Sequence, residues 1–124
     1  MAGHEIMKGR VLIIPGSDSG GGAGIQADIK TVTALGGFAM TAITALTAQN
    51  TIGVQSIYEI PANFVREQIT SVLNDIGVDV IKIGMMHRPE VIETVVEILT
   101  EKAKTIPLVL DPVMVAKGGT ELIE

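Results

Sequence analysis

A glycine-rich segment, residues 16–28, constrains the fold of this chain more than any other feature. It reads Gly-Ser-Asp-Ser-Gly-Gly-Gly-Ala-Gly-Ile-Gln-Ala-Asp, follows an apolar run at residues 11–14, and leads into a helical pattern. Glycine permits positive φ and lets a ligand approach the main chain closely, and the first N–H groups of a helix can donate to an acceptor on that ligand. We therefore predict a strand, a ligand-binding loop and a helix. The alternative is a plain tight connection, although that needs only one or two glycines.

The spacing of these glycines does not match the common nucleotide-binding loops. Gly16 and Gly21 are separated as in a P-loop, but Gly22 and Ala23 stand where that motif needs Lys and Ser or Thr. No three of the glycines fit the G-x-G-x-x-G fingerprint of dinucleotide-binding folds. The nucleotide-binding half of an oxidoreductase is therefore a weak interpretation, and we expect a binding loop of another kind.

Composition limits the classes of protein that remain. The chain has 124 residues, enough for one domain, and 47% of them are hydrophobic, which suffices for a packed core. It has no Cys, so disulfides, thiolate chemistry and Cys-ligated metals are excluded, and a cytoplasmic location is predicted. The net charge is −5 without a basic block, so we expect no nucleic-acid partner. No apolar run approaches the roughly 20 residues of a membrane span, so we expect no membrane partner.

Short apolar runs alternate with helical patterns along the whole chain, which favours an α/β fold with a mainly parallel sheet. Residues 1–9 are predicted to be a disordered lead-in, and residues 10–124 one domain. The alternating pattern at residues 54–60 indicates a strand with one wet face, at a sheet edge or in a flap. The other predicted strands are residues 10–15, 38–48, 78–83 and 108–110, and the predicted helices are residues 24–35, a segment from 61 to a stop at Gly77, and a segment from Pro89 onward.

The ends of the predicted strands carry the candidate binding residues. In open α/β sheets, ligands bind beyond the carboxyl ends of the strands. The residues that would reach that rim are Gly16, Gln49, Met85, Asp111 and Val113. They would form a mostly apolar pocket with a few polar groups, the usual form of a small-molecule site. The sequence shows no Ser–His pair, metal-binding cluster or paired catalytic carboxylates.

Two charged residues interrupt apolar patterns. Asp28 lies between Ile25 and Val32 on the apolar stripe of its helix, where it could contact a ligand or interact with the helix dipole. Lys82 interrupts an apolar strand and is predicted to be ion-paired or to extend its amine to solvent. The two histidines, His4 and His87, are predicted to lie at the surface.

The other candidates each have a structural alternative. Gln49 could hydrogen-bond the edge of a heterocycle or make an ordinary strand-end hydrogen bond. Met85 could lie against a flat ring or belong to the core. Asp111 could serve magnesium or phosphate, or could only form a turn with Pro112.

Four segments together resemble one known family. They are residues 16–28, Thr-Ala-Leu-Thr-Ala-Gln-Asn-Thr at 44–51, Lys-Ile-Gly-Met at 82–85, and Leu-Asp-Pro-Val-Met-Val-Ala-Lys at 110–117. In this order and spacing they resemble the hydroxymethylpyrimidine/phosphomethylpyrimidine kinases of thiamine biosynthesis, which are ribokinase-like enzymes. The resemblance runs along essentially the whole chain from Arg10.

The resemblance implies a three-layer α/β/α sandwich, a homodimer, and two successive phosphoryl transfers from ATP with Mg²⁺. The acceptors would be 4-amino-5-hydroxymethyl-2-methylpyrimidine and then its monophosphate. Carried over to this chain, it implies that the pyrimidine site is lined by Gly16 and Asp28, hydrogen-bonded by Gln49 and packed by Met85 and Val113. It assigns Asp111 to the metal and phosphate side.

The chain has roughly half the length of a member of this family. The resemblance places the nucleotide-binding strands and the general base in the other half, so no catalytic residue is expected among these 124 residues. Two alternatives stay open. One is a pyridoxal-type kinase of the same superfamily, and the other is a non-catalytic module that binds a pyrimidine or serves assembly.

Overall fold

The computed structural model describes residues 9–111, which form two sheets and three helices. The larger sheet has four strands, all parallel, in the order β2-β1-β5-β6. The smaller sheet is the antiparallel hairpin β3–β4. The elements are β1 (Arg10–Ile14), α1 (Gly24–Ala34), β2 (Phe38–Thr41), β3 (Ala45–Gln49), β4 (Val54–Glu59), α2 (Ala62–Asp75), β5 (Val80–Ile83), α3 (Pro89–Lys102) and β6 (Leu108–Leu110).

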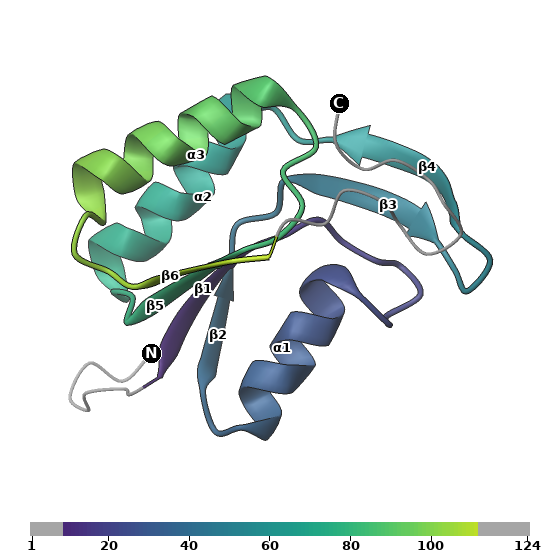
Figure 1. Cartoon of the computed structure of the whole chain (residues 1–124), viewed down its shortest axis with the longest axis horizontal. Helices are drawn as coiled ribbons and strands as arrows, with labels where there is room; N and C mark the ends of the chain where they lie inside the picture. Colours follow the sequence, from purple (N-terminus) through teal and green to yellow (C-terminus); the bar gives the residue numbers. More distant parts are fainter. Residues whose placement is uncertain (1–8, 112–124) are drawn as a thin grey trace.

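Helices cover both faces of the parallel sheet, which confirms the predicted three-layer arrangement. Figure 1 shows α2 and α3 on one face and α1 on the other. The main core lies under α2 and α3, because alternate residues of the strands point there. Its fully or nearly fully buried members include Leu12, Ile14, Ile81, Ile83, Val65, Ile69, Val95 and Ile98.

The predicted helix ends are confirmed by the backbone. Gly36 has φ +86° and follows α1, and Gly77 has φ +83° and follows α2. Glycine takes this left-handed conformation without a Cβ penalty, so each residue lets the chain turn out of its helix. The N–H of Gly77 donates to Val72 O at 3.1 Å.

The predicted strand at residues 38–48 is wrong as one element. The parallel strand β2 ends at Thr41, and the chain then turns into β3 of the hairpin. The turn is stable because its backbone finds other partners: Ala42 N donates to Ile13 O at 2.8 Å, and the Gln68 amide bonds both the N–H and the C=O of Ile43. Gln49 therefore lies on a hairpin and not at the end of a parallel strand.

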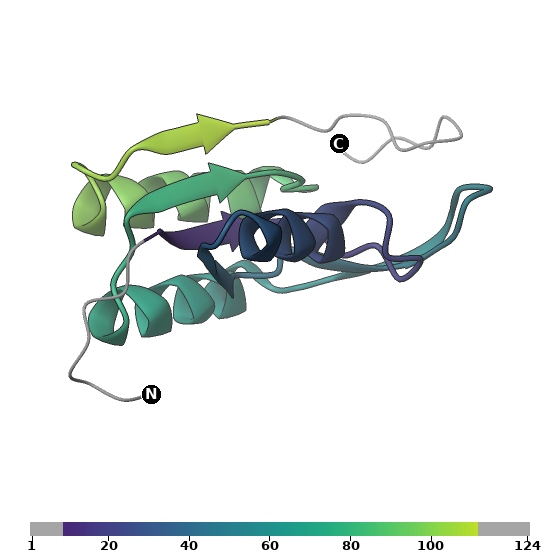
Figure 2. The ribbon, with the colours of Figure 1, turned by 90° about the horizontal axis from the view of Figure 1, so that it is seen from below.

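The hairpin projects beyond the sheet at its carboxyl end, as Figures 1 and 2 show. Its second strand, β4, confirms the strand predicted at residues 54–60, and in this two-stranded sheet it is an edge strand, one of the two predicted positions. Among residues 9–111, no helix is long and apolar enough to cross a membrane.

Candidate functional site

The glycine-rich loop is organised by Asp18. This carboxylate is only 6% exposed and accepts hydrogen bonds from Gly20 N at 2.8 Å, Gly22 N at 3.0 Å and Ala23 N at 2.8 Å. The N–H of Asp18 itself donates to Gln26 Oε1 at 2.8 Å. Loop N–H groups that would otherwise need water or ligand are thus satisfied internally. Sequence reasoning missed this role, although an Asp two residues before Gly is a known turn signal.

The loop is joined to the hairpin along one side. Ser17 N donates to Ala45 O at 2.9 Å, and Thr47 Oγ1 donates to Ser17 O at 2.7 Å. Farther along, Ser19 Oγ donates to Gln49 O at 2.8 Å and accepts from Gln49 N at 2.7 Å. The loop and the hairpin are therefore joined by hydrogen bonds from Ser17 to Ser19.

Gly16 and Met85 are brought into direct contact. A Cβ atom on residue 16 would lie 2.0 Å from Met85 Cε, so only glycine lets the thioether pack this close. Met85 is 6% exposed and packs with Ala45, Val54 and Ile57. These contacts fit the core alternative for Met85, and its packing against a ligand ring stays a prediction.

Gln49 lies half-buried at the end of β3. Its side-chain Oε1 lies 3.1 Å from Thr47 Oγ1, whose single proton is shared with the shorter bond to Ser17 O, and its backbone bonds with Ser19. The strand-end hydrogen bond is thus present. A hydrogen bond from Gln49 to a heterocycle stays a prediction.

Asp28, Lys82 and Asp111 form a charged cluster on the α1 face of the sheet. Lys82 Nζ lies 2.8 Å from both carboxylate oxygens of Asp28 and 3.9 Å from Asp111 Oδ2. Lys82 is therefore ion-paired, as one of its two predicted alternatives stated. The dipole role for Asp28 is wrong, because Asp28 is beyond the first turn of α1, which holds no acidic residue.

The backbone ties these groups to one rim. Gly84 N donates to Ile14 O at 3.0 Å, and Asp111 N donates to Ile83 O at 2.9 Å, so the carboxyl ends of β1, β5 and β6 are level. Ile25 N donates to Gly16 O at 2.9 Å, which joins the first turn of α1 to the same rim. Of the predicted site residues, Gly16, Met85 and Asp111 follow the ends of β1, β5 and β6, and Asp28 contacts β5 through Lys82. Gln49 lies on the hairpin beside Ser19, and Val113 lies outside the described residues.

A second set of ion pairs holds the base of the hairpin to the loop after β5. Glu59 lies 3.2 Å from His87 Nε2 and 3.3 Å from Arg88 Nε, and Arg88 also donates to Ile60 O at 3.0 Å. The side chain of His87 is only 14% exposed, so the surface position predicted for it is wrong. The contacts fix the segment that carries Met85.

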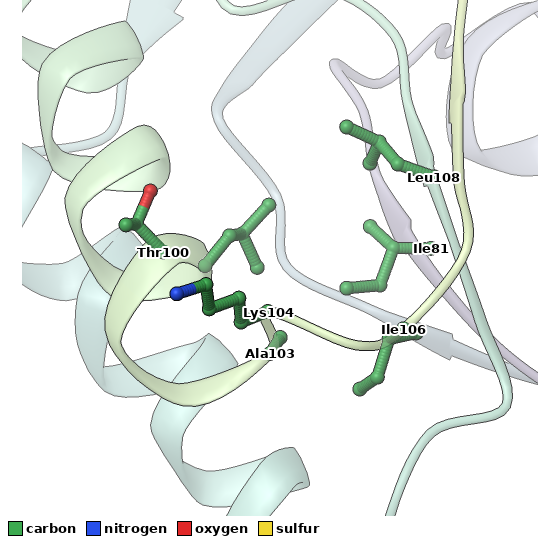
Figure 3. A pocket seen from close by; sticks show the side chains of 7 residues that line it. Ile81, Thr100, Ala103, Lys104, Ile106 and Leu108 are labelled. Atoms are coloured by element: carbon green, nitrogen blue, oxygen red, sulfur yellow. The ribbon is translucent and has the colours of Figure 1, made fainter.

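A hollow of about 250 Å³ lies on the α3 face of the sheet, between α3 and β6 (Figure 3). Its lining is mostly apolar, and within residues 9–111 no group of three His, Cys, Asp or Glu side chains could hold a metal ion there or elsewhere. The residues that line it are Ile81, Leu99, Thr100, Ala103, Lys104, Ile106 and Leu108. The chemistry-bearing side chains gather at the rim and not here.

The fold and the rim define the class: a ribokinase-like α/β domain, with which solved vitamin kinases share their fold. A family model described as phosphomethylpyrimidine kinase matches residues 18–124, and the chain belongs to this family.

The names of individual relatives agree with this family. The chain is 54% identical over 117 residues to the thiamine biosynthesis bifunctional protein ThiED of Geobacter sulfurreducens, covering 94% of this chain and 24% of that protein. It is 52% identical to the hydroxymethylpyrimidine/phosphomethylpyrimidine kinase of Streptomyces coelicolor, covering 91% of this chain and 41% of that protein.

Among solved structures, a phosphomethylpyrimidine kinase is more similar to this chain than a pyridoxal kinase is. The crystal structure of phosphomethylpyrimidine kinase from Clostridium difficile matches with a TM-score of 0.83 and 46% identity, over 93% of this chain and 49% of that one. The pyridoxal kinase of Staphylococcus aureus, solved with AMP-PCP and pyridoxal, matches with a TM-score of 0.74 and 36% identity, over 86% of this chain and 39% of that one. The chain spans less than half the length of each of these four relatives.

Proposed function

We propose that this chain supplies the pyrimidine-binding half of a hydroxymethylpyrimidine/phosphomethylpyrimidine kinase in thiamine biosynthesis. The observation that best supports the proposal is the close packing of Gly16 against Met85 beyond the ends of β1 and β5, together with the Asp28 carboxylate that Lys82 holds from β5. An aminopyrimidine has a flat ring and an N–H donor, and these two features suit a thioether and a carboxylate.

The same site is less suited to pyridoxal. Pyridoxal has no exocyclic amino group to donate to Asp28, and the pyridoxal kinase neighbours are 34–38% identical, against 46–54% for the pyrimidine kinases and ThiED protein cited above. A pyridoxal-type kinase is therefore the second candidate. Binding of a pyrimidine without catalysis is the third.

ATP and Mg²⁺ belong to the proposal through the family. Asp111 fits a magnesium ion that is held through one carboxylate and the substrate phosphates, because its side chain is 64% exposed and its contact with Lys82, at 3.9 Å, is longer than a hydrogen bond. Bound there, Mg²⁺ would neutralise charge on the phosphates of ATP. The resemblance places the general base beyond this chain, so we expect no phosphoryl transfer by the chain alone. A homodimer in the cytoplasm completes the proposal.

Calorimetric titration of the purified chain tests this function. We expect saturable binding of 4-amino-5-hydroxymethyl-2-methylpyrimidine, weaker binding of pyridoxal and none of NAD. Tighter binding of pyridoxal would favour the second candidate, and binding of NAD alone would refute the family assignment of the ligand.

An activity assay tests the expectation that the chain alone does not transfer a phosphoryl group. The intact mass of the protein is measured first, and ATP-dependent phosphorylation of the pyrimidine is then followed. We expect no turnover at a mass near 13.0 kDa. Turnover at that mass would show that the general base is within this chain or is supplied by another one.

A further inference from the structure

Lys82 stands between two carboxylates that belong to different elements. It lies on β5, which pairs with β1 and β6, and its side chain points to the α1 face. Two of its contacts, at 2.8 Å, go to the two oxygens of Asp28 on α1, and the third, at 3.9 Å, goes to Asp111 after β6. The side chains of Lys82 and Asp28 are 27% and 20% exposed, so solvent screens this pair only in part.

Fold stability does not account for this lysine. Its neighbours in β5, Ile81 and Ile83, are buried and apolar, and an apolar side chain at 82 would continue that pattern on the other face. A partly buried ion pair contributes little net stability, because the cost of desolvating both charges offsets their attraction. A role at the rim explains why the position carries a cation.

The geometry leaves Asp28 able to bind a ligand while it is held. A carboxylate has about four lone-pair positions, and one ammonium that contacts both oxygens takes two of them. The remaining two can accept N–H donors from a ligand. The ammonium also weakens the repulsion between Asp28 and Asp111, which lets two acidic groups stand at one rim.

We propose that Lys82 is a positioning residue of the pyrimidine site, which acts by fixing the Asp28 carboxylate toward the ligand. This inference rests on the proposed function and adds to it a residue through which the carboxylate is oriented. Lys82 need not touch the pyrimidine, because its effect passes through Asp28.

A double-mutant cycle tests the proposal, with the affinity for 4-amino-5-hydroxymethyl-2-methylpyrimidine measured by calorimetry. Lys82→Met removes the charge at similar length and should weaken binding about tenfold, whereas Lys82→Arg, which keeps a cation, should stay within about threefold of the parent. On the Asp28→Asn background, Lys82→Met should change the affinity less than twofold, because the group it positions has lost its charge. Lys102→Met, an exposed lysine on α3, is the matched control and should bind like the parent.

The possible results separate the positioning role of Lys82 from the proposed function of the chain. Melting curves from circular dichroism show that each variant is folded, and Lys82→Gln replaces Lys82→Met if the latter is not. Parent-like binding by a folded Lys82→Met protein, or equal weakening on both backgrounds, would overturn the positioning role and leave the proposed function standing. If Lys82→Arg binds as weakly as Lys82→Met, the orientation of a cation is not what matters and the proposal also fails. A parent chain that does not bind the pyrimidine would overturn the proposed function itself and this inference with it.

Discussion

Two ion pairs stand toward opposite ends of β5. At the amino ends of β1 and β5, Arg10 donates to Asp79 from its main-chain N at 2.9 Å, from Nε at 3.1 Å and from its terminal nitrogen at 3.0 Å. Near the carboxyl ends, Lys82 holds Asp28 through a single nitrogen. One pair joins the starts of two strands, and the other joins a strand to a helix at the rim.

The difference lies in what each carboxylate has left to offer. Asp79 accepts three donors from one residue, and Arg10 spends another on Ile76 O at 2.7 Å, so this pair is closed on itself. The side-chain hydrogen bond from Arg10 lowers the pKa of Asp79 to about 2. Asp28 uses about two of its four lone-pair positions on Lys82 and keeps the others free. The comparison teaches that two similar charged pairs can differ in free acceptor capacity, and only the Lys82–Asp28 pair keeps enough for the ligand role that we propose.

Asp28→Ala should give the largest effect. It removes the rim carboxylate, so the pyrimidine should lose a charge-assisted hydrogen bond, about 2–3 kcal/mol of binding free energy or roughly 30-fold or more in affinity. The melting temperature should change less than the affinity. Calorimetry and a thermal melt on the same sample measure both, and unchanged affinity would place Asp28 with Asp79 as a purely structural residue.

Asp18→Ala tests whether the glycine-rich loop depends on its buried carboxylate. The substitution leaves three main-chain N–H groups near the site without their carboxylate, which should cost about 2 kcal/mol of the free energy of unfolding. Urea unfolding measures the loss. Ser19→Ala, in the same loop, removes one hydroxyl and should cost less, and equal losses would contradict the organising role of Asp18.

Gln49→Ala should have an intermediate effect on binding. A neutral amide contributes about 1 kcal/mol per hydrogen bond, so the affinity for the pyrimidine should fall about fivefold. Gln55→Ala, on the exposed part of the same hairpin, serves as the control. An unchanged affinity would leave Gln49 with only its strand-end hydrogen bond.

Asp79→Asn should have the smallest effect on binding, and its cost in stability should be present above the ordinary pKa of Asp79 and should fade in acid. Because the folded pKa of Asp79 lies below its ordinary value of 3.8, the parent gains stability above that value and loses it as the pH falls toward about 2. The Asn variant should lose less stability between these pH values and should bind the pyrimidine like the parent. A pH series of thermal melts tests the first point, and weakened binding would erase the contrast between the two ion pairs.

The sequence predicted the parallel layers well and the hairpin poorly. Buried strands and capped helices leave local signals, such as the apolar run before Gly16 and the glycine stops at 36 and 77. The turn at residues 42–44 left none, because it depends on the end of β1 and on Gln68, which is far away in the sequence.

The candidate site was likewise predicted where local sequence signals exist and missed where distant residues meet. Five of the six predicted site residues fall within the described chain. Gly16, Met85 and Asp111 follow the ends of parallel strands, as predicted, whereas Asp28 lies on α1 and Gln49 on the hairpin. The Lys82–Asp28 pair was only half foreseen. The pattern predicted that Asp28 contacts a ligand or the helix dipole and that Lys82 is ion-paired or extends its amine to solvent, but it could not pair residues 54 positions apart.

The central claim is that a pyrimidine binds at the carboxyl-end rim. The most direct measurement is a series of ¹H–¹⁵N correlation spectra as 4-amino-5-hydroxymethyl-2-methylpyrimidine is added to the isotope-labelled chain. We predict saturable shifts of the amides of Gly16, Gly84 and Met85, and almost none at Arg10 and Asp79. Shifts centred on the amino-end ion pair or on the hollow beside α3, or no shifts at all, would contradict this account.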